Sequence, residues 1–181
     1  MNKAETGTFM GHTDRVITAT YRPITEHKLT VKQLSGDKIY TQNEFSTLRI
    51  TAEDAPPGKE FIGWSKTGEG ELSSWKSQTT TFTFGNGDTE LTPNYVNVWT
   101  ITVVDGTIEN KTSALLREGY TYDLKTKSLA IYEQFLGWTQ VGPGTISNTA
   151  ATYTRFTVGA GDTTITANLD LYPDKIGRAH V

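Results

Sequence analysis

The three histidines, His12, His27 and His180, are the first residues to consider for metal binding or acid–base catalysis in this 181-residue chain. Their separations fit no metal-ligand spacing, and the chain has no cysteine that could complete a thiolate site. The serines and aspartates form neither a nucleophile-elbow pattern nor a pair of carboxylates placed for acid–base catalysis. We therefore predict that the protein is not an enzyme and has no catalytic residue, no metal site and no cofactor.

Two Gly-x-Gly-Asp stretches, residues 85–88 and 159–162, are candidates for calcium binding. Calcium takes about six to eight oxygen ligands, and each stretch offers a single carboxylate. Glycine, asparagine and aspartate tolerate the positive φ angles of tight turns. We therefore favour a β-hairpin turn at each stretch, the first between strands at residues 81–84 and 90–95.

These stretches belong to a long repeat with a period of 74 positions. Phe61 and Phe135 are separated by 135 − 61 = 74 positions, as are Trp64 and Trp138. Across the 36 positions 60–95, 15 are identical to the position 74 further along the chain. Chance would give about two identities at ordinary residue frequencies. A match of this kind predicts repeated copies of one module.

The period divides the chain into four parts. Residues 1–21 are predicted to be the C-terminal end of a truncated repeat, 22–95 and 96–169 complete repeats, and 170–181 a tail. Residues 29–36 and 99–106 align at an offset of 70, which predicts about four extra loop residues in the last repeat. Residues 175–181 read like a translated sequencing adapter, the alternative being a genuine polar tail, so His180 is left out of any site.

Alternation of apolar and polar residues predicts strands at 28–34, 47–52, 100–104 and 121–126. Prolines and a glycine break one candidate helix, at 51–60. Residues 113–119 could form a turn or two of helix, but they read equally well as a strand. The predicted fold class is mainly β, with tandem modules of about five mostly antiparallel strands. The predicted core residues are Val31, Leu48, Ile50, Phe61, Trp64, Phe82, Phe84 and Leu91 in the middle repeat and Ile101, Val103, Tyr122, Leu124, Phe135, Trp138, Phe156, Val158 and Ile165 in the last.

Composition and charge argue against two classes of partner. The net charge is −3 with no basic run or stripe, so we predict no binding to nucleic acid. No apolar stretch approaches the ~20 residues that cross a bilayer, so we predict no membrane insertion. Residues 1–16 lack the apolar core of a signal peptide. The lack of cysteine is neutral about compartment.

The motif G-x-x-F-x-G-W, followed by a terminal F-T-x-x-x-x-D-T-x-[IL]-T-x-N-[YL], resembles the divergent internalin B-type B repeat, also called the Listeria–Bacteroides repeat. The resemblance spans residues 9–169, with two departures: Tyr132 replaces the glycine before Phe135, and Pro93 replaces an alanine and suggests an edge strand. The matching residues are Gly58, Phe61, Gly63, Trp64, Phe82, Asp88, Leu91, Thr92, Asn94 and Tyr95, and then Phe135, Gly137, Trp138, Phe156, Asp162, Ile165, Thr166 and Asn168.

This resemblance implies β-grasp-like modules strung in tandem on bacterial surface proteins, secreted proteins and some phage virion proteins. The family's roles are adhesion, spacing and contact with carbohydrate or a host surface, and it brings no catalytic residues. It therefore implies an extracellular or cell-surface location. The expected partners are a host-surface or cell-wall glycan or protein, and neighbouring repeats in the same chain.

A residue that recurs at the period is expected to belong to the framework, and one that does not recur is a better binding candidate. Trp75 aligns with Thr149 in a polar loop, and Trp99 lies at the repeat junction, aligned with Leu29. Either tryptophan could stack on a sugar, although packing between neighbouring units is the favoured interpretation for Trp99. The predicted framework residues are Phe61, Trp64, Phe82, Asp88, Phe135, Trp138, Phe156 and Asp162.

The predicted function is a non-catalytic adhesive or spacer segment of a bacterial surface or secreted protein. One alternative is a fibre or appendage domain of a phage virion. Another is a carbohydrate-binding module attached to a hydrolase, for which Trp75 would be the contact.

Overall fold

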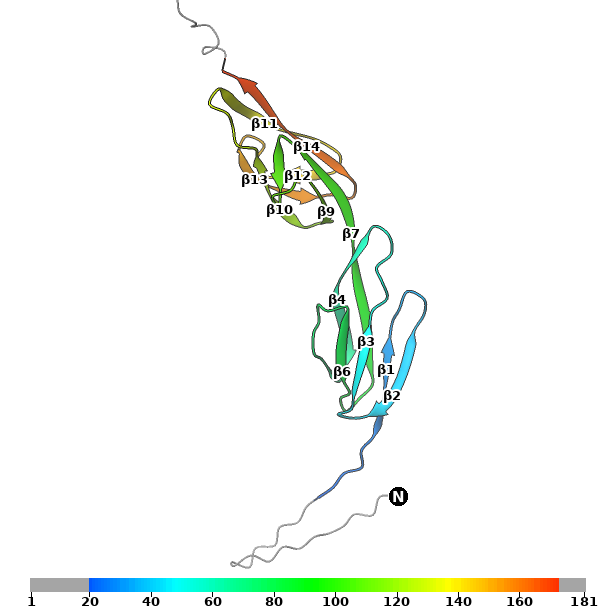
Figure 1. The fold of residues 1–181 in the computed structure, drawn as a ribbon. Coiled ribbons are helices and arrows are strands. Elements are labelled where there is room, and N and C mark those ends of the chain that lie inside the picture. The colour runs from blue at the N-terminus through cyan, green and yellow to red at the C-terminus, as the bar shows by residue number, and fades with distance from the viewer. Residues whose placement is uncertain (1–19, 173–181) are drawn as a thin grey trace, which may run out of the picture. The chain divides into compact units, whose positions relative to one another are not determined.

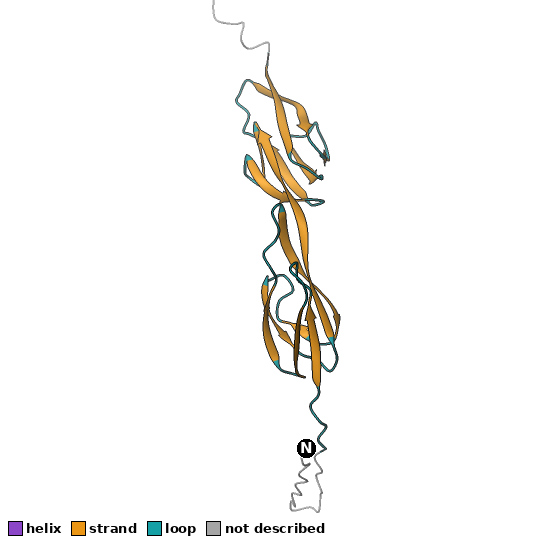
Figure 2. Ribbon diagram, turned by 90° about the vertical axis from the view of Figure 1, so that its right-hand side faces the viewer, coloured by secondary structure: helices purple, strands orange, loops and turns teal. Residues whose placement is uncertain are grey.

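The structure, a computed structural model, describes residues 20–172. Strands, loops and turns make up this range, and no helix occurs in it (Figure 2). The predicted mainly β class is confirmed. His12, His180, the truncated repeat end except for its last two residues, and the adapter-like segment lie outside the described residues.

The strands form two compact units. The first takes the chain up to Glu53 and then Gly63–Pro93, and the second takes Asp54–Ile62 and the chain from Asn94 onward. Two strands, β4 (Lys59–Gly68) and β7 (Thr89–Val104), therefore give residues to both units. The compact units do not coincide with the sequence periods throughout, and the repeat boundaries stay a prediction.

The first unit contains two sheets (Figure 1). In one, β1 pairs antiparallel with β2 and parallel with the start of β7, and β4 also pairs with β7. In the other the strand order is β3-β6-β5. Besides β4 and β7, the strands of the first unit are β1 (Glu26–Val31), β2 (Lys38–Asn43), β3 (Thr47–Thr51), β5 (Glu71–Leu72) and β6 (Thr79–Thr83).

The second unit repeats this plan with one added strand. The end of β7 pairs parallel with β14 and antiparallel with β9, and β11 pairs antiparallel with β14. The other sheet has the order β12-β13-β10-β8. Besides parts of β4 and β7, the strands of the second unit are β8 (Gly106–Ile108), β9 (Ser113–Arg117), β10 (Thr121–Thr126), β11 (Glu133–Val141), β12 (Gly144–Ile146), β13 (Tyr153–Val158) and β14 (Thr163–Leu171).

The strand register corrects the alignment of the two first strands. Leu29 lies opposite Thr89, and Ile101 lies opposite Thr163. The threonines are 163 − 89 = 74 positions apart, whereas Leu29 and Ile101 are 101 − 29 = 72 positions apart. The predicted offset of 70 is therefore wrong, and Ile101 rather than Trp99 corresponds to Leu29. The last unit carries two extra residues before β10 instead of four.

The predicted hairpins at residues 85–88 and 159–162 are also wrong. The first stretch joins β6 to β7, and the second joins β13 to β14, but in each case the two strands belong to different sheets. The turns therefore carry the chain from one sheet to the other. Turn residues alone cannot distinguish a hairpin within one sheet from a connection between two sheets, because a strand's pairing partner is set by contacts distant in sequence.

The strand β7 differs from the prediction in length and in neighbours. Residues 90–95 and 100–104, predicted as separate strands, lie in this single strand of 16 residues. Its pairing with β1 and β14 is parallel, whereas eight other strand pairings are antiparallel, so the predicted mostly antiparallel arrangement is confirmed. Pro93 lies in β7, which as a whole has neighbours on both sides. The register with β1 ends at Leu91, two residues before Pro93, so the strand is unpaired with β1 at the proline, in keeping with its missing N–H donor.

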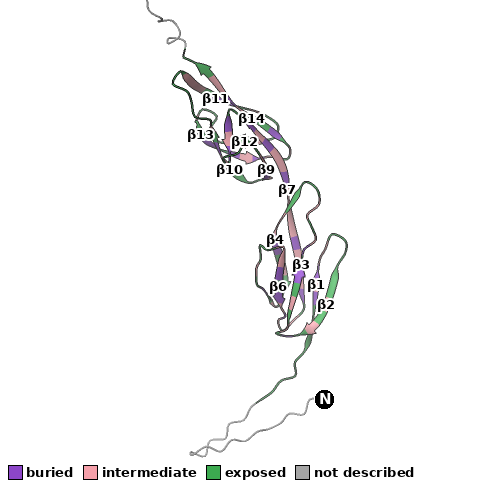
Figure 3. Cartoon of the chain, viewed as in Figure 1, coloured by how far each residue is buried: buried purple, intermediate pink, exposed green. Residues whose placement is uncertain are grey.

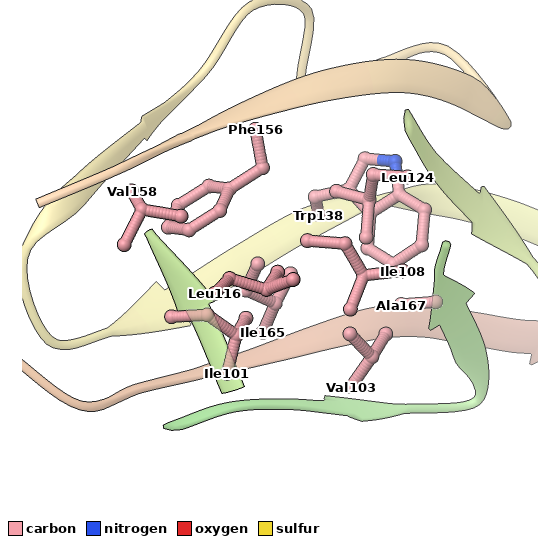
Figure 4. Close-up of a cluster of buried hydrophobic side chains, with 10 residues drawn as sticks. All are labelled: Ile101, Val103, Ile108, Leu116, Leu124, Trp138, Phe156, Val158, Ile165 and Ala167. Carbon is pink, nitrogen blue, oxygen red and sulfur yellow. The ribbon is translucent and has the colours of Figure 1, made fainter. Parts of the chain in front are cut away.

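The core of the second unit lies between its two sheets (Figure 4). Ile101 and Ile165 come from one sheet, and Leu124 and Phe156 from the other, and all four are fully buried. In the first unit buried residues also come from both sheets, whereas β2 is mostly exposed (Figure 3). All of the predicted core residues are buried except four half-buried ones: Leu48, Phe61, Tyr122 and Phe135.

One fully buried residue that the sequence pattern missed is Ile108, in the added strand β8. Leu124 lies opposite Ile108 in the sheet. Leu34 and Gly36, which precede Ile108 by 74 and 72 positions, both lie in an exposed loop. The added strand therefore gives the second unit an apolar core residue that the first unit lacks at this place.

Candidate functional site

Trp64 holds a loop of the first unit with two hydrogen bonds. Its backbone N–H donates to the carbonyl oxygen of Trp75 at 2.9 Å, and its indole Nε1–H donates to that of Ser77, also at 2.9 Å. The indole is buried, at 6% exposure. Both acceptors are backbone atoms, so the contacts fix the path of the loop without depending on its side chains. We call residues 73–78 the first clamped loop.

Trp138 makes the same pair of contacts in the second unit. Its backbone N–H donates to the carbonyl oxygen of Thr149 at 2.8 Å, and its indole N–H to that of Ala151, also at 2.8 Å. Each donor and acceptor lies 74 positions after its counterpart in the first unit. Residues 147–152 are therefore the second clamped loop. The recurrence of tryptophan at the period has a physical cause, since this side chain both fills the core and holds the loop.

The glycine before each tryptophan leaves room for the clamped loop. Gly63 and Gly137 have positive φ angles of 141° and 136°. A Cβ atom on Gly63 would lie 2.8 Å from the carbonyl oxygen of Trp75, and one on Gly137 would lie 3.2 Å from that of Thr149. Glycine is required here both by backbone conformation and by the close approach of the loop.

A buried threonine supports each clamped loop from the neighbouring strand. The backbone N–H of Ser74 donates to Thr80 Oγ1 at 3.0 Å, and that of Asn148 donates to Thr154 Oγ1 at the same distance. Both threonines are buried. The loops therefore have fixed backbones in both units, which lowers the entropy lost when a loop of this kind binds a ligand.

The side chains that the two clamped loops present are different. Trp75 is 41% exposed in the first loop, and Thr149 stands at the same place in the second. Lys76 and Ser77 beside Trp75 are also exposed. Of the two tryptophans predicted as binding candidates, Trp75 thus offers an accessible indole on a fixed loop.

Trp99, the other candidate, is half-buried and packs against the core of the second unit. Its indole N–H donates to Glu118 Oε2 at 2.9 Å, and Asn97 Nδ2 donates to the same oxygen at 3.0 Å. These two donors stabilise the carboxylate and lower the pKa of Glu118. Much of the Trp99 side chain is therefore used by contacts within its own unit.

Asp88 and Asp162 hold the first strand of each unit. Asp88 Oδ1 accepts a hydrogen bond from the backbone N–H of Lys28, and Asp162 Oδ1 accepts one from that of Thr100, each at 2.8 Å. A single carboxylate per turn is used for this structural bond. Hydrogen bonds to charged groups contribute more than neutral ones, about 1.5–3 kcal/mol.

Arg117 and Glu60 form a two-pronged ion pair in the second unit. Arg117 Nη2 lies 2.6 Å from Glu60 Oε1, and Arg117 Nε lies 2.9 Å from Glu60 Oε2. The hydrogen bonds from the guanidinium lower the pKa of Glu60, and the carboxylate raises the pKa of Arg117. This pair fixes Glu60 to β9, although Glu60 lies far before that strand in the sequence.

Residues 20–172 contain one histidine and no cluster of metal-binding side chains. His27 is half-buried, and its Nε2 lies 3.2 Å from Thr25 Oγ1. Among residues 20–172 there is no group of three or more His, Asp or Glu side chains placed to hold a metal ion. The same range contains no helix with the length and apolarity of a membrane span.

Each unit thus defines a mainly β module with a backbone-clamped loop. Residues 30–99 match the family model described as Divergent InlB B-repeat domain. The family suggested by the Gly-Trp and terminal Thr-rich motifs is thereby confirmed for this stretch, and it suggests a repeat module of surface proteins. No curated protein and no solved structure matches the chain.

The sequence identified the tryptophans as recurring residues but not their action on the loops. That action depends on backbone carbonyls, which every residue carries, so no residue type marks it. The sequence signal that could have found it is the constant distance from each Gly-Trp to a loop of the same length and different composition.

Proposed function

We propose that the chain is a non-catalytic adhesive or spacer segment of a bacterial surface or secreted protein, built from tandem copies of one β-grasp-like module with a period of 74 positions. The match of residues 30–99 to a repeat family of surface proteins supports this proposal. The contacts that recur at the period support it too, above all those of Trp64 and Trp138.

The adhesive role is carried by one observation, the exposed Trp75 on a loop whose backbone is fixed by Trp64. An indole presents a flat apolar face and a polar edge at low entropic cost, and such groups are enriched at binding sites. Neighbouring serine hydroxyls and Lys76 add hydrogen-bond donors. This combination suits a glycan or a polar protein surface as the ligand.

A surface location is tested by labelling cells with an antibody raised against the folded chain. We expect the antibody to label intact cells of the organism that encodes the protein. Labelling only after the cells are lysed would contradict the proposal, and co-purification with phage particles would support a virion appendage instead.

Adhesion is tested with beads that carry the purified chain, flowed over arrayed glycans and matrix proteins. We expect Trp75→Ala to reduce bead retention at least tenfold, and Thr149→Ala, at the corresponding place in the second clamped loop, to leave it unchanged. Equal retention by all three proteins would remove Trp75 as the contact. If no surface retains the parent chain, the spacer role alone would stand.

A further inference from the structure

The end of the second unit exposes four apolar side chains. Ile131, Tyr132, Leu171 and Tyr172 are 76%, 49%, 50% and 44% exposed. The backbone N–H of Tyr172 donates to the carbonyl oxygen of Tyr132 at 2.9 Å, and Leu171 lies opposite Glu133 in the β11–β14 register, so the four residues lie at the same end of these two strands. We call them the terminal apolar patch. Exposed large apolar side chains gathered at one end of a module are candidates for an interaction surface.

A second place in the chain has the same backbone arrangement. The N–H of Val98 donates to the carbonyl oxygen of Gly58 at 2.9 Å, and both residues precede Tyr172 and Tyr132 by 74 positions. A preceding turn also recurs: Lys59 N–H donates to Pro56 O at 3.0 Å, and Glu133 N–H to Ala130 O at 2.9 Å. The two strand ends are therefore equivalent in structure.

The two places differ in what covers them. Val98 is only 6% exposed, because it belongs to the second unit, where it lies opposite Arg117 of β9. The carbonyl oxygen of the preceding Asn97 accepts a hydrogen bond from the N–H of Glu118 at 2.9 Å. Within residues 20–172, Leu171 pairs only with β11, and no strand corresponding to β9 lies beside it.

The side chains at the end of the second unit are larger and more apolar than their counterparts. Pro57, Gly58, Asn97 and Val98 correspond to Ile131, Tyr132, Leu171 and Tyr172. Larger apolar side chains gain more free energy when they are covered, about 25 cal/mol for each Å² of apolar surface removed from water. The terminal apolar patch is thus better suited to docking than the place that is already covered.

We propose that the terminal apolar patch docks a further copy of this module that follows directly in the same polypeptide. The strand of that copy equivalent to β9 would lie beside Leu171 and Tyr172, as β9 lies beside Val98. A copy following in the same chain reaches the patch without a linker, so its effective concentration there is high. This inference extends the proposed tandem array by naming the surface through which one copy meets the next.

The test appends a further copy of the module directly after Tyr172. Because Tyr172 corresponds to Val98, residues 173–181 are replaced by a copy of residues 99–172, and in a second protein by a copy of residues 27–98. Amide hydrogen exchange is measured over residues 129–136 and 169–172 of the original chain. We expect exchange there to slow at least tenfold in both extended proteins relative to the parent chain.

Two matched variants show whether the patch is responsible. Tyr172→Asp in the extended proteins is expected to abolish the slowing, and Tyr153→Asp, at a similarly exposed tyrosine outside the patch, to preserve it. Unchanged exchange in both extended proteins overturns the proposal, as does slowing that survives Tyr172→Asp. Failure of both appended copies to fold would also overturn it, since the patch would then not accept this module. Surface display is measured on cells, so the proposed function and this docking can fail independently.

Discussion

The backbone N–H of Trp64 lies 2.9 Å from the carbonyl oxygen of Trp75, so a buried tryptophan fixes the position of an exposed one. The first recurs at the period and the second does not. The same bond joins Trp138 to Thr149 at 2.8 Å. Framework and presented surface are therefore separate parts of each module, connected through backbone atoms.

Truncation of a clamping tryptophan is expected to destabilise its unit strongly. Trp138→Ala removes a buried aromatic side chain and should cost about 3–5 kcal/mol. Trp138→Phe keeps most of the volume but loses the bond to Ala151, and should cost about 1–2 kcal/mol. Urea unfolding measures both values. Trp75→Ala is the control, with an expected change within about 0.5 kcal/mol, and an equally large effect there would contradict the assignment of the two roles.

Substitution of the glycine before each tryptophan is expected to displace the clamped loop. Gly63→Ala and Gly137→Ala each force a side chain into a positive-φ conformation, at about 1–3 kcal/mol. Gly63→Ala should cost more, because its Cβ would approach the loop carbonyl to 2.8 Å, against 3.2 Å at Gly137. Thermal unfolding checks this order.

Gly36→Ala is the matched control for these two variants. Gly36 also has a large positive φ, at 124°, but a Cβ atom there would meet nothing within 4 Å. Its substitution therefore measures the conformational cost without a close approach. A cost at Gly63 no greater than at Gly36 would argue against close approach of the loop as the reason for glycine.

Loss of the aspartate bond is expected to loosen the first strand of a unit. Asp88→Ala leaves the N–H of Lys28 without its acceptor, and Asp162→Ala does the same to Thr100. We expect a cost of about 1–3 kcal/mol for each, with faster amide exchange at Lys28 or Thr100 respectively. Asp37→Ala removes an exposed, solvent-screened ion pair with Lys32 and is the control, with no expected effect on either amide. Unchanged exchange at both amides would count against the role given to the aspartates.

The ion pair of Glu60 with Arg117 is expected to contribute stability that depends on pH. The guanidinium lowers the pKa of Glu60 in the folded state. The contribution is therefore fully present above the ordinary carboxyl pKa of about 4.3 and is lost as the pH falls through the lower folded-state pKa. Both side chains are partly exposed, so the size should be about 0.2–1 kcal/mol.

Urea unfolding of the parent chain and Glu60→Gln at pH 7 and pH 3 measures this dependence. We expect the variant to be less stable at pH 7 and the difference to shrink at pH 3. Glu26→Gln makes the same change of charge at an exposed position and should show no such difference. A difference in unfolding free energy between the parent chain and Glu60→Gln that grows toward pH 3 would contradict a lowered pKa of Glu60 in the folded state.

Local patterns predicted the strands well and their partners poorly. Alternation placed β1, β3 and β10 because each has one buried face. It did not reveal that residues 85–88 join different sheets, since pairing depends on distant contacts. Ile108 was missed because a three-residue strand is too short to show alternation.

The sequence predicted which side chain the candidate site presents but not the backbone contacts that hold the loop. Trp75 stood out because its position is occupied by threonine one period later. The clamp itself was hidden, because its acceptors are carbonyl groups. The true offset between Leu29 and Ile101 was hidden as well, since Thr30 aligns with a threonine at either offset, Thr100 at 70 and Thr102 at 72.

The bonds from the two clamping tryptophans use only backbone acceptors in the loops, and this has an evolutionary consequence. Point substitutions at positions 75 and 77, or 149 and 151, leave the acceptor atoms in place, and the two loops already differ at both positions. Duplication followed by mutation within the loop is therefore enough to give each copy its own surface chemistry. Each copy keeps the framework contacts, so its exposed loop residues can change without a change of fold.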